Sequence, residues 1–504
     1  MSGLTKETLD LYRKCQANPV ADNDALGKTA GYNQSATATS GLTTYDLDPI
    51  LGHLYPVLTP LRDMIPRKTG GKGIQANWRA ITGVNTANTG IGISEGNRGG
   101  AITHTTSDYT AAFKGIGLDD YVTYEQDWTS EGFVDTKAEA VTGLINAVMI
   151  GEENVILGGN NSMALGTVST PTVADITTGG AITQTIAMRV YCVALTYDGF
   201  LGSTVAGGLP LSATRTLSDG TTEAYNQGTS IKSAVGTVTT ATDGLTTHSV
   251  SATVTAVANA YAYAWYWGTV GIELLGAITT INSVLITTTI PTGTQNISAG
   301  FTVDKSRNSL VYDGLMTQIA TSGSGAYVYT MATGTAGTGT ALTAGNDGTI
   351  TEIDTALKSF WDSYKLSPDT MWVSSQEMKN IRKKALAGTS STAQRFNFVT
   401  DQKGIVIGTG VKSYSNPFAM GPVVDVEIKL HPSLPAGTIV FTSRTIPYKL
   451  PNVAVPLRML MRRDYYQIDY PQIKRKFEYG VYCDGVLQNY FPPAFGMITN
   501  IGNG

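Results

Sequence analysis

Residues Gly92 to Gly96 read Gly-Ile-Ser-Glu-Gly and match the Gly-x-Ser-x-Gly pattern of a serine nucleophile. In hydrolases with this pattern, the serine lies in a sharp turn that is followed at once by a helix. Here the sequence continues as NRGGAITHTT, and these glycines and threonines are poor helix formers. We therefore interpret the segment as an ordinary turn and not as a nucleophile.

Other residue types that could carry chemistry lack the necessary spacing. The histidines are scattered without metal-ligand spacing, so structural or surface roles are expected for all of them: His53, His104, His248 and His431. Asp119 and Asp120 are neighbours in an alternating segment, so their side chains point to opposite faces of a strand and form no acid–base pair. The run GGKG at residues 70–73 lacks the spacing of a phosphate-binding loop. The sequence predicts no catalytic, cofactor or metal site, and no enzyme.

The composition excludes several classes of protein. Charged residues are 15% of the 504 residues, against about 25% in a typical soluble protein. The net charge of −4 gives no overall basic excess of the kind that nucleic-acid-binding proteins use on phosphates, although a local basic face is compatible with it. Three distant cysteines without a Cys-x-x-Cys pair predict free thiols in a reducing compartment. No apolar run of about 20 residues and no secretory signal are recognised, so no membrane association is expected.

The first part of the chain predicts an arm, a long hairpin and a long helix. Residues 1–45 combine a short amphipathic segment with a polar stretch, which is typical of an arm that orders against a partner. Residues 46–129 alternate apolar and polar residues around glycine-rich turns, and such a two-stranded excursion lacks a core of its own. Apolar residues then recur at helical spacing over 130–158, with Ser130 as the expected N-cap. The helix face so predicted carries Val134, Ala138, Val141, Ile145, Val148 and Glu152. A helix of about 28 residues spans roughly 42 Å.

The middle of the chain changes in composition. From 167 to 300 charged residues become rare, and about seven short β-branched runs alternate with turns, which predicts a β-sandwich. The segment MRVYCVALTYDGFLGS is expected to pair with the later strand ANAYAYAWYWGTVG. In that strand, aromatic residues recur at every second position and are expected to face the core rather than an exposed ligand: Tyr261, Tyr263, Trp265 and Trp267.

The last part, residues 301–504, predicts a helix–strand–helix unit followed mainly by strands. Met371 to Val373 are expected to form a short buried strand. The helix before it is expected to carry these residues on one face: Ile350, Ile353, Leu357, Phe360, Trp361 and Tyr364. Ser374 and Glu377 have the spacing of a capping box at the start of the next helix. The later segments HPSLPAGTIVFTSR and YCDGVLQNYFPPAFGMI indicate further strands.

Several of these segments, in this order, resemble the major capsid proteins of tailed bacteriophages with the HK97-like fold. The resemblance lies in EGNRGG…AFKGIGLDDYVTYEQDW, in LSPDTMWVSSQEMKNIRKKAL and in the two later segments quoted above. It covers roughly residues 46–160 and 301–500, and residues 167–300 resemble an inserted immunoglobulin-like or fibronectin type III-like domain. It implies an α+β fold with an extended loop, a spine helix (within 130–166), and peripheral and axial domains.

The resemblance also implies a function. The chain would form pentamers and hexamers of an icosahedral head that encloses double-stranded DNA, assembled in the host bacterial cytoplasm. Portal, scaffolding and cement proteins would be its partners, with nonspecific contact to packaged DNA. A related alternative is an encapsulin-like compartment or another phage structural protein such as a tail component. A cell-surface adhesion protein is a weaker alternative, because no secretion signal is present.

Charged residues in and near the extended loop are candidates for contact between subunits. Lys72, Arg98 and Lys114 would pair across subunits, with Glu95 and Asp119 as candidate acceptors, and such pairs give register more than affinity. A second basic cluster consists of Arg458, Arg462, Arg463, Lys474, Arg475 and Lys476. We expect this cluster to pair with a neighbouring subunit rather than to face DNA, because acidic residues are interleaved with it.

Overall fold

The computed structural model describes residues 56–84, 90–130, 135–217, 220–345, 348–386, 400–401, 404–405, 411–419, 425–446, 453 and 455–502. The arm predicted over residues 1–45 and His53 therefore lie outside the described residues. The chain divides into two compact units. One spans residues 56–124 and 137–504 and holds every described strand, and the described part of the other lies within residues 125–136.

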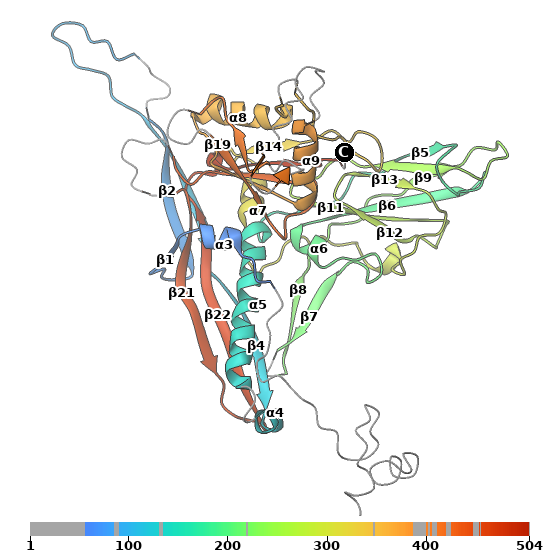
Figure 1. Cartoon of the computed structure of the whole chain (residues 1–504), viewed down its shortest axis with the longest axis horizontal. Coiled ribbons are helices and arrows are strands. Elements are labelled where there is room, and N and C mark those ends of the chain that lie inside the picture. The colour runs from blue at the N-terminus through green and yellow to red at the C-terminus, as the bar shows by residue number, and fades with distance from the viewer. Residues whose placement is uncertain are drawn as a thin grey trace, which may run out of the picture. The chain divides into compact units, whose positions relative to one another are not determined.

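A four-stranded sheet runs alongside the long helix α5 (Figure 1). Its strands stand in the order β1 (Arg67–Thr69), β21 (Leu457–Asp469), β22 (Lys476–Asn489) and β4 (Lys114–Thr123). Strand β1 pairs with β21 in parallel, and the other neighbours are antiparallel. The short helices α3 (Pro60–Met64) and α4 (Tyr124–Thr129) flank β1 and β4 in sequence. The sheet thus joins three segments that are far apart in the chain.

Helix α5 (Thr136–Gly158) is shorter than the sequence predicts. It begins six residues after Ser130, so Ser130 is not its N-cap, and its 23 residues span roughly 34 Å. Its buried face includes Leu144, which packs with Val148 against Val481 of β22, whereas the predicted face residue Ile145 is 37% exposed. The apolar stripe is therefore rotated by one residue at this point.

By length and composition alone, α5 also meets the criteria for a membrane span, which the sequence analysis does not anticipate. Two carboxylates near its C-terminal end, Glu152 and Glu153, are almost fully buried inside the protein. Buried carboxylates need charged or hydrogen-bonding partners, and both have them within this chain. The C-terminal part of α5 is therefore packed as a core helix.

A second, six-stranded sheet has the order β14 (Tyr327–Thr330), β23 (Gly496–Thr499), β20 (Ile439–Thr442), β15 (Thr370–Val373), β19 (Asp425–Leu430) and β18 (Ser413–Ser415). Helices α7 (Leu315–Ala320), α8 (Thr351–Tyr364) and α9 (Ser375–Leu386) belong to the same region, with the small pair β16 (Thr400–Asp401) and β17 (Gly404–Ile405). The predicted helix–strand–helix unit is confirmed as α8, β15 and α9. Ile353, Leu357 and Phe360 of α8 are buried as expected, whereas Tyr364 at the end of the helix is 39% exposed.

The capping box predicted for α9 is only half formed. Ser374 Oγ accepts a hydrogen bond from Glu377 N at 3.3 Å, as predicted. The Glu377 carboxylate instead accepts from Gly437 N at 3.0 Å and from Asn380 Nδ2. Burial raises the pKa of this carboxyl to about 7. Glu377 therefore joins α9 to the loop before β20, which local sequence spacing does not reveal.

The region predicted as a sandwich forms two sheets of three and four strands (Figure 1). One has the order β13 (Ser283–Ile286), β10 (Ser249–Thr253) and β5 (Thr172–Ile176). The other has β12 (Leu274–Thr279), β11 (Ala262–Gly268), β6 (Ala187–Leu195) and β9 (Gly236–Thr239). The helix α6 (Tyr197–Leu201) follows β6, and the hairpin of β7 (Ser212–Thr216) and β8 (Thr222–Asn226) forms a separate pair. The predicted pairing of β6 with β11 is confirmed.

The aromatic strand β11 packs into the protein, as predicted. Tyr263, Trp265 and Trp267 lie in one buried cluster with residues of β5, β6, β10 and β13. Tyr261 precedes the strand and belongs instead to the large core that contains the six-stranded sheet. The interpretation as core residues is thus confirmed. The two-sheet architecture is present, and its assignment to the immunoglobulin-like class stays a prediction.

His248 holds a turn of this sandwich against β5. Its Nδ1 lies 2.9 Å from Asp175 Oδ1, and its Nε2 lies 2.9 Å from Asp243 Oδ1. Both ring nitrogens carry a proton only in the charged imidazolium. The hydrogen bonds to Asp243 and Asp175 raise the pKa of His248, although burial opposes the charge.

We expect the turn at residues 240–248 to open more easily as the pH rises above about 6.5, the usual pKa of histidine. A group whose pKa is higher in the folded state than in the unfolded state stabilises the fold while it is protonated. This stabilisation is complete below the pKa of the unfolded state and is lost as the pH rises through the pKa of the folded state. Hydrogen exchange of the β10 amides, measured from about pH 6 to about pH 9 and corrected for intrinsic exchange rates, reports the opening of this turn. The protection of these amides should fall with rising pH in the wild type and not in His248→Gln. His104→Gln, at an exposed position on β3, is the matched control. The same pH dependence in His248→Gln and the wild type would contradict the role of His248.

The predicted α+β fold is confirmed. A long hairpin, a long helix against a four-stranded sheet, and a second sheet flanked by helices are the elements that the HK97-like fold implies. The domain boundaries at residues 45, 129, 166 and 300 remain predictions.

Candidate subunit interface

The two-stranded excursion predicted from the sequence is formed by β2 (Gln75–Val84) and β3 (His104–Ala112). They pair antiparallel from Gln75 opposite Ala112 to Val84 opposite His104, and they form a sheet of their own. At the base, Trp78 Nε1 donates to Asn489 O at 2.9 Å, and the Trp78 ring stacks on Tyr109. The base is therefore anchored, and residues 90–103 of the connection project away from the sheets (Figure 1).

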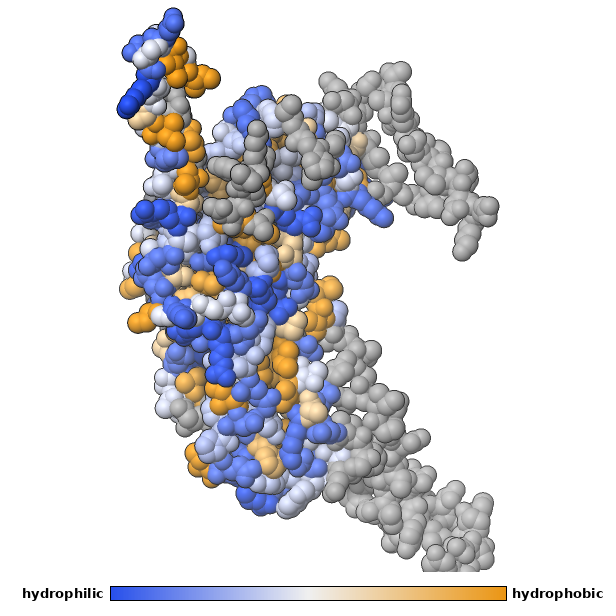
Figure 2. Space-filling view, turned by 90° about the vertical axis from the view of Figure 1, so that its left-hand side faces the viewer, coloured by the Kyte–Doolittle hydropathy of each residue, from blue (hydrophilic) through white to orange (hydrophobic). Residues whose placement is uncertain are grey.

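Apolar side chains follow this excursion without being covered. Figure 2 shows hydrophobic patches along the projecting segment. Each of the following is more than half exposed: Ile74, Ile81, Val84, Ile91, Ile93 and Ile102. Large contiguous apolar surface on a projecting element is typical of a surface that another molecule covers.

Residues 90–103, which contain the Gly-x-Ser-x-Gly match, belong to no helix or strand and include one turn. Asn97 N donates to Ser94 O at 3.1 Å and Asn97 Nδ2 donates to Ser94 Oγ, and Gly96 supplies the positive φ of 81° that the turn needs. No helix follows Ser94 within residues 95–103. The segment thus lacks the geometry that a nucleophilic serine requires.

Three of the predicted contact residues are solvated within this chain. Lys72, Glu95 and Arg98 are exposed. Within the described part of the chain, none of the three makes a hydrogen bond or ion pair. Their charges are therefore available to another molecule.

Lys114 and Asp119, both on β4, have partners in the same chain. Lys114 Nζ donates to Ser309 O at 2.5 Å. Asp119 Oδ1 accepts a hydrogen bond from the Tyr482 hydroxyl, which lies 2.5 Å from the Tyr470 hydroxyl. The structure thus separates these two residues from the three solvated ones.

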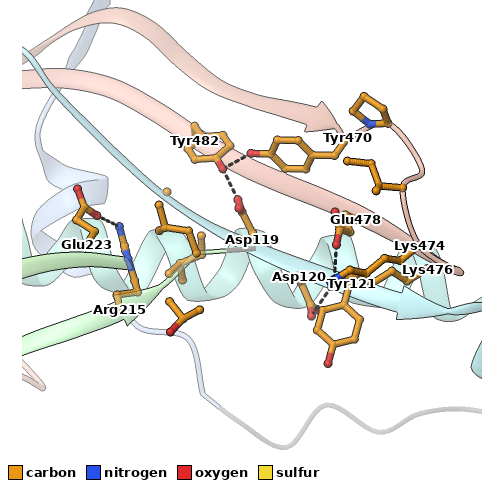
Figure 3. A pocket seen from close by; sticks show the side chains of 16 residues that line it. Asp119, Asp120, Tyr121, Arg215, Glu223, Tyr470, Lys474, Lys476, Glu478 and Tyr482 are labelled. Carbon is orange, nitrogen blue, oxygen red and sulfur yellow. Dashed lines mark hydrogen bonds and ion pairs between the residues drawn. The ribbon is translucent and has the colours of Figure 1, made fainter. Parts of the chain in front are cut away.

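Asp119 also lines a cleft of about 810 Å³. Figure 3 shows that β4, the turn between β21 and β22, and the β7–β8 hairpin contribute its walls. Arg215 and Glu223 pair across the hairpin at 2.8 Å, and Lys476 pairs with Glu478. The cleft lining as a whole holds four carboxylates and three cations: Asp119, Asp120, Glu223 and Glu478 against Arg215, Lys474 and Lys476. So small a negative excess gives little selection for an ion.

The second predicted cluster, on β21 and β22, is largely paired within the chain. Arg462 Nη2 lies 3.0 Å from Asp484 Oδ2, and the Arg463 guanidinium lies 4.1 Å from the centre of the Tyr466 ring. Arg458 donates to Gln488 Oε1 at 2.9 Å. A role for Arg462 and Arg463 across a subunit contact stays a prediction.

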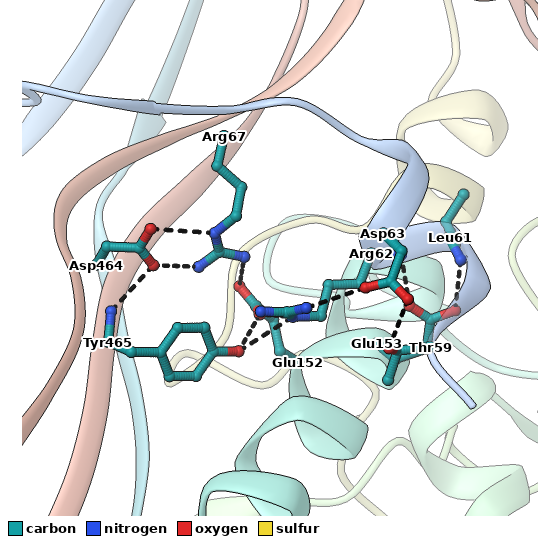
Figure 4. Close-up of polar contacts among 9 residues, drawn as sticks. All are labelled: Thr59, Leu61, Arg62, Asp63, Arg67, Glu152, Glu153, Asp464 and Tyr465. Atoms are coloured by element: carbon teal, nitrogen blue, oxygen red, sulfur yellow. Dashed lines mark hydrogen bonds and ion pairs between the residues drawn. The ribbon is translucent and has the colours of Figure 1, made fainter. Parts of the chain in front are cut away.

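A buried charge network joins α5 to β21 and to the segment before β2 (Figure 4). Glu152 accepts from Arg62 Nε and from Arg67 Nη1, each at 2.8 Å, and from the Tyr465 hydroxyl. Arg67 Nη2 also lies 2.7 Å from Asp464 Oδ1. Burial opposes the charge of Arg67, but the hydrogen bonds and charges of Asp464 and Glu152 outweigh it and raise its pKa.

The next residue, Glu153, connects α5 to both neighbouring regions. Its two oxygens accept from Leu61 N at 2.9 Å and Arg62 N at 2.7 Å, at the start of α3. Its Oε1 also lies 2.7 Å from Nε2 of the buried His431, which follows β19. Sequence reasoning placed Glu152 on the apolar stripe without a partner. The only available signal was a carboxylate at a core position of a helix, which requires a cationic partner.

No family profile and no curated protein matches the sequence. Solved structures match over most of the chain. "Capsid of native GTA particle computed with C5 symmetry" has 9% identity and a TM-score of 0.41, covering 96% of this chain and 100% of that chain. "Gordonia phage Cozz" has 9% identity and a TM-score of 0.41 (96% and 97% covered), and "Mycobacterium phage Bobi" has 8% identity and a TM-score of 0.39 (91% and 95%). All three similarities are distant, with TM-scores below 0.5.

Proposed function

We propose that this chain is the major capsid protein of a tailed bacteriophage, which assembles into the pentamers and hexamers of an icosahedral head around double-stranded DNA. The β2–β3 excursion carries this proposal. It exposes six large aliphatic side chains on an element with no core of its own. A two-stranded hairpin is at best marginally stable alone, so a covering partner explains both its length and its composition.

The partner that fits best is a second copy of the chain. Identical copies can cover one another's excursions in a closed ring. A head-to-tail contact generates such a ring when the repeated rotation from one subunit to the next returns to the first subunit. Lys72, Glu95 and Arg98 present unpaired charges of both signs near the apolar surface. Such charges fix the register of a contact more than they add affinity.

The core of the subunit is suited to bear load between such contacts. Glu152 and Glu153 fasten α5 to α3, to β21 and to the residue after β19. A rigid helix tied to both sheets transmits force from the excursion to the rest of the subunit. The roles of portal, scaffolding and cement proteins, and assembly in a host cytoplasm, belong to the same proposal.

Negative-stain electron microscopy of the purified full-length chain tests the proposal directly. Closed icosahedral particles, or rings of five and six subunits, are expected. A chain that stays monodisperse and monomeric over a wide range of concentration and ionic strength would overturn it. Open fibres with a helical repeat would instead assign the chain to a tail-like assembly.

A further inference from the structure

Helix α9 presents a basic face that the described part of the chain does not neutralise. Lys379, Arg382 and Lys383 are exposed and Lys384 is partly buried. The only carboxylate of the helix, Glu377, is buried and accepts hydrogen bonds from Gly437 and Asn380. Among the described residues, no carboxylate forms an ion pair with any of the four cations.

The surrounding sequence extends this excess of positive charge. Between residues 379 and 412 there is one acidic residue, Asp401. The same stretch holds these basic residues: Lys379, Arg382, Lys383, Lys384, Arg395, Lys403 and Lys412. The whole chain has a net charge of −4. The helix dipole favours cations in the last turn of a helix, which accounts for Lys383 and Lys384 but not for Lys379.

The other basic cluster is engaged differently. Arg462 pairs with Asp484, and Lys476 pairs with Glu478. A polyanion that binds there has to displace these carboxylates first. On α9 the cations at positions 379, 382 and 383 share one helix face at spacings of three and four residues, and they lose only water on binding.

We propose that the exposed face of α9 is a contact surface for the phosphate backbone of double-stranded DNA. This inference rests on the proposed function, in which the shell encloses DNA. A short row of cations on a helix without base-reading partners suits nonspecific contact with phosphates, whose strength depends on the release of counterions. It places the DNA contact on the six-stranded-sheet region, which contains α9, and leaves the β21–β22 cluster to its carboxylate partners.

Binding of a fluorescently labelled 24-base-pair duplex to the unassembled full-length chain, measured by anisotropy over a salt series, tests this. The double variant Arg382→Gln with Lys383→Gln should lower the slope of log K against log salt by about 2, since each phosphate contact contributes about 0.9. Near 0.1 M salt, this corresponds to roughly 60-fold weaker binding. The control is Lys358→Gln on α8 with Lys365→Gln directly after it, which removes two positive charges from exposed positions, one of them paired with Asp362, and should leave the slope unchanged.

Equal slopes for the α9 variant and the wild type would overturn the inference, as would equal losses in the α8 and α9 variants. Polyglutamate that competes as well as DNA at the same charge concentration would assign the face to an acidic protein and overturn it too. Circular dichroism should show that both variants keep the wild-type melting temperature. Electron microscopy of the same protein separates the two proposals. If particles form but the α9 variant binds DNA like the wild type, only this inference is contradicted. If α9 contributes to DNA binding but no particles form, only the capsid function is contradicted.

Discussion

Glu152→Gln is expected to lower the free energy of unfolding by about 3–5 kcal/mol, the cost of removing one partner from a buried ion pair. Glu152 is fully buried and accepts from two guanidinium groups that are themselves mostly buried. The glutamine keeps the shape but directs an amide N–H₂ toward one of these cations, and it supplies no negative charge. Arg62 then lacks a buried counterion, whereas Arg67 keeps Asp464. Urea unfolding at neutral pH measures the change.

Two further variants separate the lost charge from lost packing. Glu152→Gln combined with Arg62→Met should recover part of the stability, because it removes a buried cation that is left with the exposed Asp63 as its counterion. Asp108→Asn breaks the Arg79–Asp108 pair, whose side chains are 68% and 60% exposed, and should cost far less, because exposed ion pairs contribute little to stability. If Glu152→Gln costs no more than Asp108→Asn, the network does not stabilise the subunit.

The parts of the fold that follow from local patterns were predictable. The helix–strand–helix unit of α8, β15 and α9 was anticipated because its apolar spacing, its Pro-Asp turn at 368–369 and its Ser374 cap all lie within some 40 residues. The pairing of β6 with β11 was anticipated because both strands alternate strongly. The start of α5 was not, since the residues after Ser130 fit a helical pattern equally well.

The contacts that hold these elements together were not predictable from one sequence. The partners of Glu152 lie 85, 90 and 313 residues away along the chain, and no local spacing encodes such distances. The same holds for Lys114, whose ammonium group reaches Ser309. The exposure of Ile81 on β2 was equally hidden, because alternation can place a residue on one face of a strand and cannot say whether that face is covered. The candidate contact residues were thus identified by position, and the structure sorts them into solvated and engaged ones.

The hairpin provides the second large expected effect: Ile91→Asp with Ile93→Asp should abolish closed particles while leaving the subunit folded. Both side chains are more than half exposed in the single chain, so the folded subunit should change by less than about 0.5 kcal/mol. Covering each isoleucine in an assembly contributes about 1.5–3 kcal/mol, and a buried, unpaired carboxylate adds a further cost. The loss per contact is therefore at least about 3 kcal/mol, or more than about 100-fold in the assembly constant.

Light scattering and electron microscopy at matched subunit concentration measure this loss. The matched control is Val270→Asp with Ile290→Asp, which makes the same chemical change at two positions of the sandwich that are each 71% exposed. Because these positions lie outside the excursion, particles should form as in the wild type. Normal particles from the hairpin variant would show that the exposed isoleucines are not covered by a second copy, and equal failure of both variants would indicate that added negative charge alone prevents assembly. The contact is assigned to residues 91–93 only if the hairpin variant fails to form closed particles and the control variant forms them. This assignment does not depend on any single salt bridge.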